Sequence, residues 1–342
     1  MRDKAAVVVL NWNGIDYIRM CLEAVFVQSY ESMRVIVVDN HSTDGSLEVI
    51  RDDFPEAELV ELPDNLGFAK GTNTGVRRAL AEPLIRWIAT LNNDTRVDPE
   101  WLAEMVRTCE ADPRVGMVAS KILFMDRPRV LNSTGILIAR DGSARDRGWL
   151  ETDEGQYDDK LDVFGPSAGA ALYRREMLED IGLFDEDFWG YLEDLDLAWR
   201  GRLAGWVGRF APRSIVHHKY SASTGFHSTL KIRVSERNRI WTLVRNYPAR
   251  DLIVAIPWNA GRLALSSVRR ILGLGPRTAV GDRPAFRETA RAIAQARLEA
   301  YRGLPRAFEK RRITQASACV DRRAVETWFR LFAVPLAELT RT

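Results

Sequence analysis

The chain has 342 residues, with 46% hydrophobic and 28% charged side chains and a net charge of +2, which excludes disordered, collagen-like and disulfide-stapled proteins. Its three cysteines, Cys21, Cys109 and Cys319, show neither metal-ligand spacing nor a disulfide framework, and so they indicate a reducing compartment. The N-terminal apolar run is too short for a signal peptide, and the absence of a stretch of about 18 apolar residues predicts that there is no transmembrane helix.

The N-terminal third alternates short β-rich runs with helical patterns. Buried strands are predicted at 5–10, 35–38, 58–62 and 85–91, and helices at 15–29, 47–54 and 70–80. This rhythm predicts an α/β fold with a Rossmann-like, mostly parallel sheet and helices on both faces. In such sheets ligands bind beyond the carboxyl ends of the strands.

The remaining sequence divides into two stretches. Residues 116–238 are irregular and rich in Gly, Asp and aromatics, whereas residues 239–342 are helical in pattern and rich in Arg and Ala. We expect one domain at 1–238, with halves at 1–115 and 116–238, followed by a helical extension at 239–342. Breaks at Pro257, Gly273, Pro276, Gly281 and Pro284 predict that this extension consists of short helices.

Polar clusters follow the first two predicted strands. Asn11-Trp12-Asn13-Gly14 can present backbone N–H groups to a ligand, but it is not a GxGxxG fingerprint and is equally compatible with a plain βα turn. Asp39 and Asn40 end the second strand. The Asp39 carboxylate can accept hydrogen bonds from a nucleobase or a ribose, or it can cap the next turn.

A third cluster, Asn92-Asn93-Asp94, follows the fourth strand. Divalent cations prefer hard oxygen ligands, so Asp94 can hold Mg²⁺ or Mn²⁺ against a diphosphate. Such a cation would stabilise a departing nucleotide diphosphate as a Lewis acid. The alternative is a loop aspartate that bonds to its own backbone.

A fourth cluster places three carboxylates within four residues, at Glu193, Asp194 and Asp196. If a helix begins here, Glu193 and Asp194 lie near its N-terminus, and the helix dipole is expected to lower their pKa values. Adjacent residues point in different directions on a helix, so we expect only one of the two to face a reacting centre. The alternative is an acidic helical turn without chemistry.

In this order, the four clusters resemble glycosyltransferase family 2, with its GT-A fold, over roughly residues 5–223. The resemblance implies an inverting enzyme that uses a nucleotide-diphosphate sugar and a divalent metal. Asp194 matches the general base, with Glu193 beside it, and Asp94 matches the metal-binding end of a DxD-type motif. The residues expected at the donor are Asn11, Asn13, Asp39, Asn65, Gly67, Lys70, Asn73, Asn92 and Asn93. Gly169 and Trp189 are expected at the acceptor, so that 1–115 becomes the nucleotide-binding half and 116–238 the acceptor half.

Two positions depart from the family pattern. Asn92 stands where the motif has its first carboxylate, so a metal needs another ligand, for which His217 or His218 is the candidate and His218 is preferred. The processive QxxRW pattern is absent, because the corresponding stretch ends in Trp199-Arg200 without the glutamine, and this predicts a single transfer per encounter.

The sequence is most similar to the rhamnosyltransferase-like branch of the family. That likeness implies dTDP-L-rhamnose as donor and a polyprenyl-diphosphate-linked saccharide as acceptor, in cell-surface polysaccharide assembly. The alternative functions are a non-catalytic nucleotide-sugar-binding protein and a sugar nucleotidyltransferase. The retained Glu193-Asp194 pair argues against the first, and the lack of a basic loop beside Asn11–Gly14 argues against the second. The sequence leaves the nucleobase, the linkage and the oligomeric state open.

Charge is distributed unevenly along the chain. Residues 241–342 hold 19 Lys and Arg against 8 Asp and Glu, whereas the rest holds 30 against 39. The basic region is predicted to meet an anionic membrane surface at the cytoplasmic face, with Arg262, Arg269 and Arg270 opposite an apolar side of Leu265, Val268, Ile271 and Leu272. Packing of that apolar side on the first domain is the alternative. Nucleic acid is disfavoured, since no recognition motif accompanies the charge.

Overall fold

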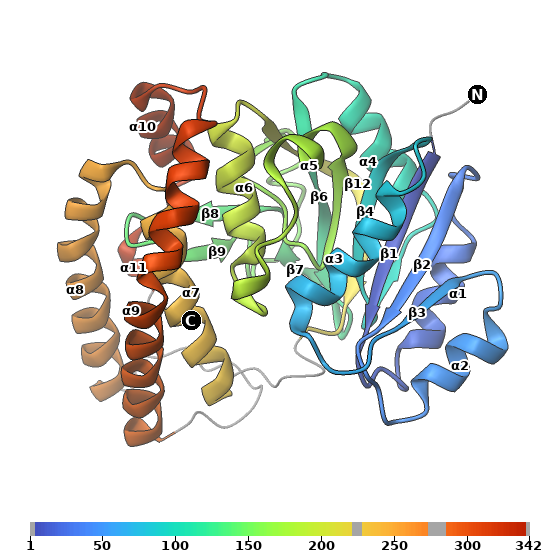
Figure 1. Ribbon diagram of the computed structural model, residues 1–342, viewed down its shortest axis with the longest axis horizontal. Helices are drawn as coiled ribbons and strands as arrows, with labels where there is room; N and C mark the ends of the chain where they lie inside the picture. The colour runs from blue at the N-terminus through green and yellow to red at the C-terminus, as the bar shows by residue number, and fades with distance from the viewer. Residues whose placement is uncertain (1–3, 221–227, 273–284, 340–342) are drawn as a thin grey trace.

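The computed structural model describes residues 4–220, 228–272 and 285–339. A mixed ten-stranded sheet forms its centre, in the order β10-β12-β6-β11-β4-β1-β2-β3, with β5 paired to β12 and β7 to β6 (Figure 1). The predicted α/β fold, with a mostly parallel sheet and helices on both faces, is confirmed.

The strands of the main sheet are β1 (Lys4–Asn11), β2 (Met33–Asp39), β3 (Glu58–Glu61), β4 (Ile85–Asn92), β5 (Thr95–Val97), β6 (Val115–Phe124), β7 (Arg127–Ser133), β10 (Asp162–Val163), β11 (Ala170–Arg174) and β12 (Val207–His218). A separate hairpin consists of β8 (Ile136–Ile138) and β9 (Ala144–Asp146).

The helices are α1 (Ile18–Phe26), α2 (Ser46–Asp53), α3 (Gly67–Leu80), α4 (Trp101–Glu110), α5 (Arg175–Ile181), the 3₁₀ turn η1 (Glu186–Phe188), α6 (Glu193–Leu203), α7 (Thr229–Asn246), α8 (Ala249–Ile271), α9 (Phe286–Ala316), α10 (Arg322–Leu331) and α11 (Leu336–Leu339).

Strand β1 shows why helices cover both faces of the sheet. Successive side chains of a strand point to opposite faces. Ala5, Val7 and Val9 are buried in the core that contains α1 and α4, whereas Ala6 and Val8 are buried in the core that contains α3, α5 and α6. Because both faces are apolar, the strand is a continuous hydrophobic run, as expected of a buried parallel strand.

Strand directions bring distant segments to one edge of the sheet. Strand β1 pairs in parallel with β2 and β4, and β2 pairs in parallel with β3. Strand β11 is antiparallel to both β4 and β6, and β12 is parallel to β6. The two reversals cancel, so β6 and β12 run in the direction of β4. The carboxyl ends of β1, β2, β4 and β12 therefore lie along the same edge.

The C-terminal helices share the core of the sheet. The rings of Trp328 and Phe332 contact Phe164, and Trp328 also contacts Trp199 of α6. The backbone N–H of Val334 donates to the carbonyl of Ile138 at 2.9 Å. The helical region is thus packed into the same structure as the sheet. Within the described ranges, no helix combines the length and hydropathy that a membrane crossing requires.

Three sequence-based expectations for this region are wrong. The boundary expected at residue 238 lies inside α7, and the helical region does not consist of short helices alone, since α8 has 23 residues and α9 has 31. Helix α8 continues through Pro257, which is exposed, so that water can reach the carbonyl that loses its hydrogen bond. Gly273, Leu274, Pro276, Gly281 and Pro284 lie outside the described residues.

Arg262 is also placed differently from the expectation. Its guanidinium donates to the buried Asp141 carboxylate at 2.6 Å and to Glu236 at 2.8 Å, so it faces the protein interior rather than an external surface. The exposed side of α8 is apolar instead and includes Ile253 and Ile256, which are 70% and 69% exposed.

Candidate active site

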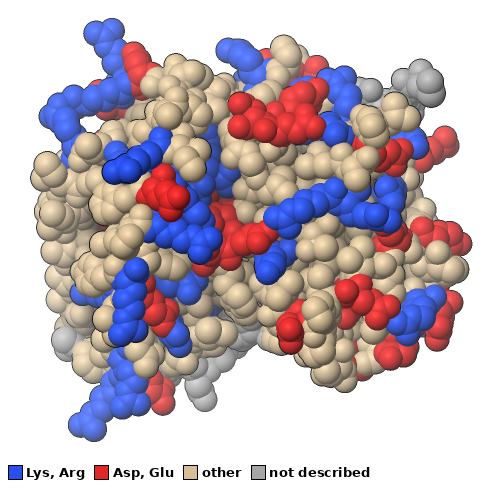
Figure 2. Space-filling view, viewed as in Figure 1, with Lys and Arg blue, Asp and Glu red and all other residues tan. Residues whose placement is uncertain are grey.

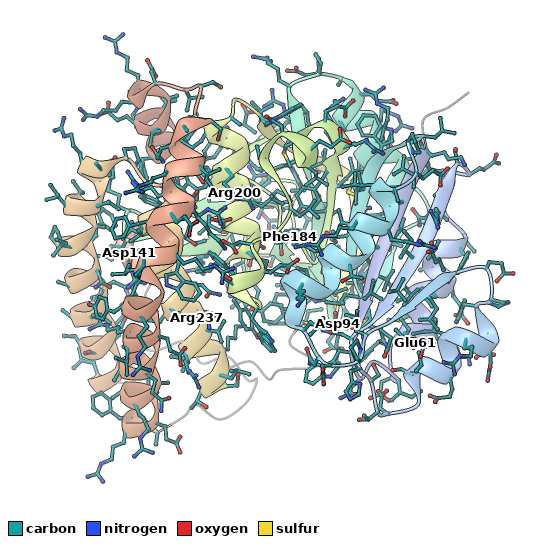
Figure 3. The ribbon with its side chains drawn as sticks, viewed as in Figure 1. Glu61, Asp94, Asp141, Phe184, Arg200 and Arg237 are labelled. Carbon is teal, nitrogen blue, oxygen red and sulfur yellow. The ribbon has the colours of Figure 1, made fainter. Side chains whose placement is uncertain are left out.

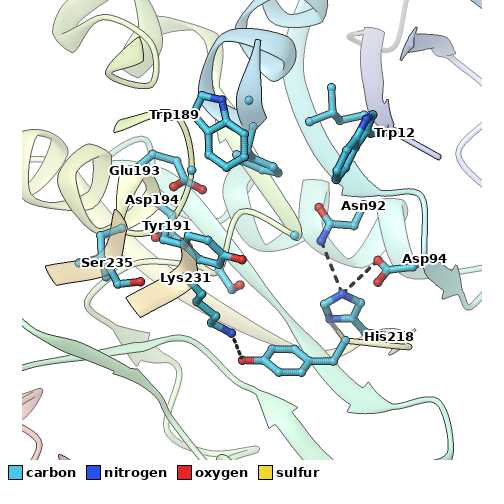
Figure 4. Close-up of a pocket in the computed structure, with 18 of the residues that line it drawn as sticks. Trp12, Asn92, Asp94, Trp189, Tyr191, Glu193, Asp194, His218, Lys231 and Ser235 are labelled. Atoms are coloured by element: carbon cyan, nitrogen blue, oxygen red, sulfur yellow. Dashed lines mark hydrogen bonds and ion pairs between the residues drawn. The ribbon is translucent and has the colours of Figure 1, made fainter. Parts of the chain in front are cut away.

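A cavity of about 430 Å³ lies at the edge of the sheet where the parallel strands end (Figure 4). The ends of β1, β4 and β12, strand β9, the segment before α6 and the start of α7 form its wall. Ten of the predicted site residues line it, namely Asn65, Gly67, Asn92, Asn93, Asp94, Gly169, Trp189, Glu193, Asp194 and His218. Five do not, namely Asn11, Asn13, Asp39, Lys70 and Asn73.

Asp39 anchors a loop behind the lining residues. Its carboxylate accepts hydrogen bonds from the Asn11 amide at 2.8 Å, the Ser42 hydroxyl at 2.6 Å and the Ser42 backbone N–H at 2.9 Å. The carboxylate thus caps the turn after β2, which is the alternative that the sequence left open. Its neighbour Asn40 lines the cavity instead.

Asn11 and Asn13 tie the first strand to its neighbours. The buried Asn11 side chain donates to Asp39 and accepts from the Asn93 amide at 2.7 Å, so it links the ends of β1, β2 and β4. The side-chain oxygen of Asn13 accepts from the backbone N–H of Thr43 at 2.8 Å. These asparagines hold the strand ends in place rather than lining the cavity.

Two further predicted donor residues lie on α3. The buried Asn73 amide donates to the Phe184 carbonyl at 2.9 Å and accepts from the Phe184 N–H at 3.1 Å, so it anchors the segment that leads to η1. Lys70 is exposed on the same helix. Neither residue lines the cavity, so the geometry does not support their expected contacts with a donor.

Gly67 brings the donor side of the cavity against the opposite wall. Its φ angle is +79°, in the region that favours glycine, and a β-carbon there would lie 2.4 Å from the backbone oxygen of Trp189. The carboxamide oxygen of Asn65 accepts from the Gly67 N–H at 2.9 Å and from the Asn40 amide at 3.0 Å. A larger residue at position 67 would push Trp189 away.

Asp94 and His218 lie in contact at the cavity. Oδ1 of Asp94 lies 3.1 Å from Nε2 of His218, and Nδ2 of Asn92 lies 3.5 Å from the same ring nitrogen (Figure 4). The other ring nitrogen of His218 lies 3.4 Å from Oδ1 of Asn132, which orients the imidazole. One carboxylate oxygen and one imidazole nitrogen therefore point toward a common place.

Strand alternation decides between the two adjacent histidines. His217 and His218 both lie at the end of β12, and neighbouring residues of a strand point to opposite faces. His218 lines the cavity, whereas Nε2 of His217 lies 3.7 Å from Asp98 outside it. The preference for His218 is consistent with this geometry.

Glu193 and Asp194 begin α6, whose N-terminus faces the cavity. Both side chains line it, so the expectation that only one would face the centre is wrong. A helix that meets a cavity end-on presents its first two residues around its axis, whereas a helix that meets it side-on presents one face. Oε2 of Glu193 is buried and finds no hydrogen-bond partner among the described residues.

Burial controls the acidity of this pair. It raises the pKa of Asp194, and burial together with the charge of Asp194 raises the pKa of Glu193 well above its ordinary value. The expected lowering by the helix N-terminus is therefore wrong, because desolvation outweighs the dipole. Asp194 accepts hydrogen bonds from the N–H groups of Ala168 at 3.2 Å and Leu195 at 2.7 Å, which favour its charged form. The pair thus consists of a poised base and a carboxyl that stays protonated more readily.

Asp196, the third carboxylate of the cluster, has a structural role. Burial by itself raises its pKa, but the charges of Arg245 and Arg200 outweigh burial and lower that pKa. Nε of Arg200 donates to Asp196 at 2.8 Å, and the Asn246 amide donates at 2.8 Å. Asp196 is fully buried and does not line the cavity.

Four charged or phenolic lining residues carry no motif in the sequence. They are Arg145 and Asp146 on β9, Tyr220 after β12 and Lys231 on α7. Nζ of Lys231 donates to the Tyr220 hydroxyl at 3.2 Å and lies 5.4 Å from the centre of the Tyr191 ring. Burial lowers the pKa of Lys231 and raises the pKa of Asp146 to about 6. Only the fold brings β9 and α7 to this cavity, so no local pattern could have found them.

Residues 6–182, more than half of the chain, match the profile of glycosyl transferase family 2, and the chain belongs to this family. It is therefore a glycosyltransferase that transfers a sugar from a nucleotide donor. The predicted family is confirmed.

One curated relative aligns over most of its length. The N-acetylglucosaminyl-diphospho-decaprenol L-rhamnosyltransferase of Mycobacterium tuberculosis is 23% identical over 275 residues, which are 70% of this chain and 87% of that protein. The other similar curated proteins include a poly-beta-1,6-N-acetyl-D-glucosamine synthase of Staphylococcus aureus, 26% identical over 59% of this chain and 46% of that protein.

Solved structures share the fold. The mannosyltransferase PcManGT from Pyrobaculum calidifontis, in complex with GDP-Man and Mn²⁺, superposes with a TM-score of 0.50 and 20% identity over 96% of this chain and 79% of that one. GalNAc-T7 with UDP, GalNAc and Mn²⁺ gives a TM-score of 0.55 and 14% identity over 71% of this chain and 48% of that one. Both likenesses identify a GT-A-like fold.

The raised pKa of Asp146 predicts how stability depends on pH. Its pKa is about 6 in the folded chain, above the value near 3.9 expected when unfolded, so folding favours the protonated form. The stabilisation is complete below about pH 4 and is lost as the pH rises through 6. Between pH 4.5 and 7.5, the free energy of unfolding of the wild type should therefore fall by about 2 kcal/mol more than that of Asp146→Asn, in urea titrations. Parallel curves for the two proteins would contradict the assignment.

Proposed function

We propose that this chain is an inverting, non-processive glycosyltransferase that moves L-rhamnose from dTDP-L-rhamnose to a polyprenyl-diphosphate-linked saccharide. The observation that carries this proposal is that a candidate metal-binding pair and a candidate base pair line the same cavity. Asp94 and His218 lie on one side, and Glu193 and Asp194 lie on the other (Figure 4).

Asp194 acts as the general base of the proposed reaction. It takes the proton of an acceptor hydroxyl as that oxygen forms a bond to the anomeric carbon of the donor sugar. The bond between that carbon and the nucleotide diphosphate breaks on the opposite face, so the configuration inverts. A raised pKa suits this role, because a base is most effective when its pKa lies near the operating pH.

Asp94 and His218 suit a divalent cation that is bound together with the donor. Asp94 and His218 offer a hard oxygen and an imidazole nitrogen 3.1 Å apart, a donor set that suits Mn²⁺ or Mg²⁺. Across residues 4–220, 228–272 and 285–339, no three His, Cys, Asp or Glu side chains converge on a metal site. The remaining ligands would therefore come from the diphosphate and water. When bound, the cation neutralises charge on the departing diphosphate.

Lys231 and Arg145 supply positive charge to the same cavity. A nucleotide-diphosphate donor and a diphosphate-linked acceptor both carry phosphates, whose burial next to Asp94, Asp146 and Asp194 would be unfavourable without cations. The two basic residues thus favour an anionic substrate over a neutral one.

The residues at the position of the processive pattern support a single transfer. Trp199 is fully buried, and Arg200 donates to Asp196 and to the carbonyls of Ile181 and Leu183 (Figure 3). Neither side chain lines the cavity. Their burial away from the cavity supports a single transfer per encounter.

The name of the Mycobacterium tuberculosis relative supports the choice of substrates. That protein is named for L-rhamnose transfer to N-acetylglucosaminyl-diphospho-decaprenol, and the alignment covers 87% of its length. We extend L-rhamnose as the transferred sugar, and the same class of acceptor, to this chain.

Replacement of the base tests the reaction. Asp194→Asn should lower the transfer rate from dTDP-L-rhamnose by about 10²–10⁴-fold, because the asparagine cannot accept the proton. Thermal stabilisation by dTDP with Mn²⁺ should stay as in the wild type. The same shift assay with UDP and GDP sugars ranks the donors. Wild-type turnover by Asp194→Asn would contradict the base, and a larger stabilisation by UDP or GDP sugars would contradict the rhamnose donor.

The adjacent histidines provide a matched test of the cation. EDTA should abolish transfer, and Mn²⁺ or Mg²⁺ should restore it. His218→Ala should raise the Mn²⁺ concentration needed for half-maximal activity at least about tenfold, whereas His217→Ala should leave it unchanged. Thermal stabilisation by dTDP in a Mn²⁺ titration gives the same comparison without turnover. Full activity in the chelator, or equal effects of the two substitutions, would remove the cation from the proposal.

We also propose that the chain binds the anionic inner face of the cell membrane through α8. Ile253, Ile256, Ala260, Ala264, Val268 and Leu272 recur every three or four residues and are all exposed. This spacing places them on one side of the helix. Helix α8 forms an outer edge of the molecule, where Figure 2 shows mostly uncharged side chains with basic groups beside them. An exposed apolar stripe next to basic residues suits a lipid interface.

Vesicle binding by the full chain tests this surface. The double substitution Ile253→Glu/Ile256→Glu should lower binding to vesicles with anionic lipid at least tenfold, because it places two carboxylates in the apolar stripe. Ile313→Glu, at a 69% exposed position on α9, is the control and should bind as the wild type does. Equal binding by all three proteins would exclude α8 as the membrane surface. The full chain is used because α10 is part of the core, so a chain shortened before the C-terminal helices would lose core residues.

A further inference from the structure

The segment that precedes the proposed base has an unfavourable backbone. Trp189, Tyr191 and Leu192 have φ angles of +63°, +65° and +66°, although none of them is glycine. The N–H of Gly190 donates to the carbonyl of Phe188 at 2.7 Å, which makes Trp189 the centre of a tight turn that is rare and strained. Left-handed conformations are costly for residues with a β-carbon and persist only where the surroundings hold them.

One side chain of α7 holds this segment. Asn238 is fully buried, and its amide nitrogen shares its two N–H groups among the carbonyls of Phe188 at 3.0 Å, Gly190 at 2.8 Å and Tyr191 at 2.7 Å. The neighbouring Arg237 adds a hydrogen bond to the Phe188 carbonyl at 2.9 Å (Figure 3). The unusual φ angles turn these carbonyls toward one place. A hydrocarbon side chain there would take the Asn238 donor away from the carbonyls of Gly190 and Tyr191, which is unfavourable for buried oxygens.

The same helix also holds the segment that follows the base. Two turns beyond Asn238, Arg245 pairs with Asp185 and Asp196, and the Asn246 amide donates to Asp196 at 2.8 Å. Residues seven or eight apart lie on one face of a helix. One face of α7 thus contacts the chain on both sides of Glu193 and Asp194.

We propose that Asn238 is a positioning residue for the transfer reaction. By donating to three carbonyls, it holds the Trp189–Leu192 segment in its strained conformation, and this conformation sets the direction in which Asp194 enters the cavity. Trp189, Tyr191 and Leu192 line the same cavity, so their backbone also shapes the wall that faces the acceptor. The inference rests on the proposed role of Asp194 as base.

The test compares Asn238→Leu with Thr242→Val. Leucine has nearly the shape of asparagine but lacks the donor. Thr242, one turn later on α7, is fully buried, and its hydroxyl has no hydrogen-bond partner in the described part of the chain, so valine controls for a change in the buried face of α7. Asn238→Ser keeps one donor and serves as the conservative variant if the leucine variant folds poorly.

Three measurements are made on each full-length protein. Asn238→Leu should lower kcat at least tenfold while the KM for the donor changes less than twofold, because Asn238 bonds to none of the residues expected at the donor. Backbone amides of residues 188–196 should exchange hydrogen at least tenfold faster. Asn238→Ser should give intermediate values, and Thr242→Val should behave as the wild type in all three measurements. The acidic limb of the pH–rate profile should shift in Asn238→Leu, since the environment of Asp194 changes.

Two results would overturn the proposal. One is wild-type kcat and wild-type exchange in Asn238→Leu. The other is an equal loss of kcat and of donor affinity in Asn238→Leu and Thr242→Val, which would indicate general destabilisation of α7. Hydrogen exchange needs no turnover, so it decides whether Asn238 holds the segment even if Asp194→Asn shows that Asp194 is not the base.

Discussion

The structure depends on keeping four carboxyl groups in one partly dry cavity. Asp94, Asp146, Glu193 and Asp194 all line it, and their mutual repulsion adds to the unfavourable loss of water around each charge. The raised pKa values of three of them are the direct consequence. Grouping these carboxylates is electrostatically unfavourable, and a cation bound among them would reduce their repulsion.

Relief of this repulsion comes from many parts of the fold. His218 reaches Asp94 from β12, Lys231 enters the cavity from α7, and the N–H of Ala168 reaches Asp194 from the loop before β11. None of these elements could be removed without exposing a carboxylate to an uncompensated environment. Helix α7 thus contributes a residue to the cavity, and the C-terminal helices pack against the same core, since the Trp328 ring contacts Phe164.

Many elements could be predicted from local sequence. The apolar runs after Lys4 and Arg34 became β1 and β2 within two residues, because a strand buried on both faces must be apolar throughout. The positions of Asp94 and Asp194 followed from the order of strand ends and from the family pattern. The break predicted at Pro257 failed, because one proline on an exposed helix face does not outweigh the packing of a long helix.

By itself, the sequence determined most strands and helices of the N-terminal third, the family, and the residue types that gather at the strand ends, since these depend on local periodicity and on short motifs. Only the tertiary structure decided which groups share the cavity. Asp39 caps a loop, and His218 rather than His217 contacts Asp94. Asp146 and Lys231 line the cavity although their segments carry no motif. The reason is physical: burial, strand direction and charge separation in space are properties of the folded chain, and no window of sequence contains them.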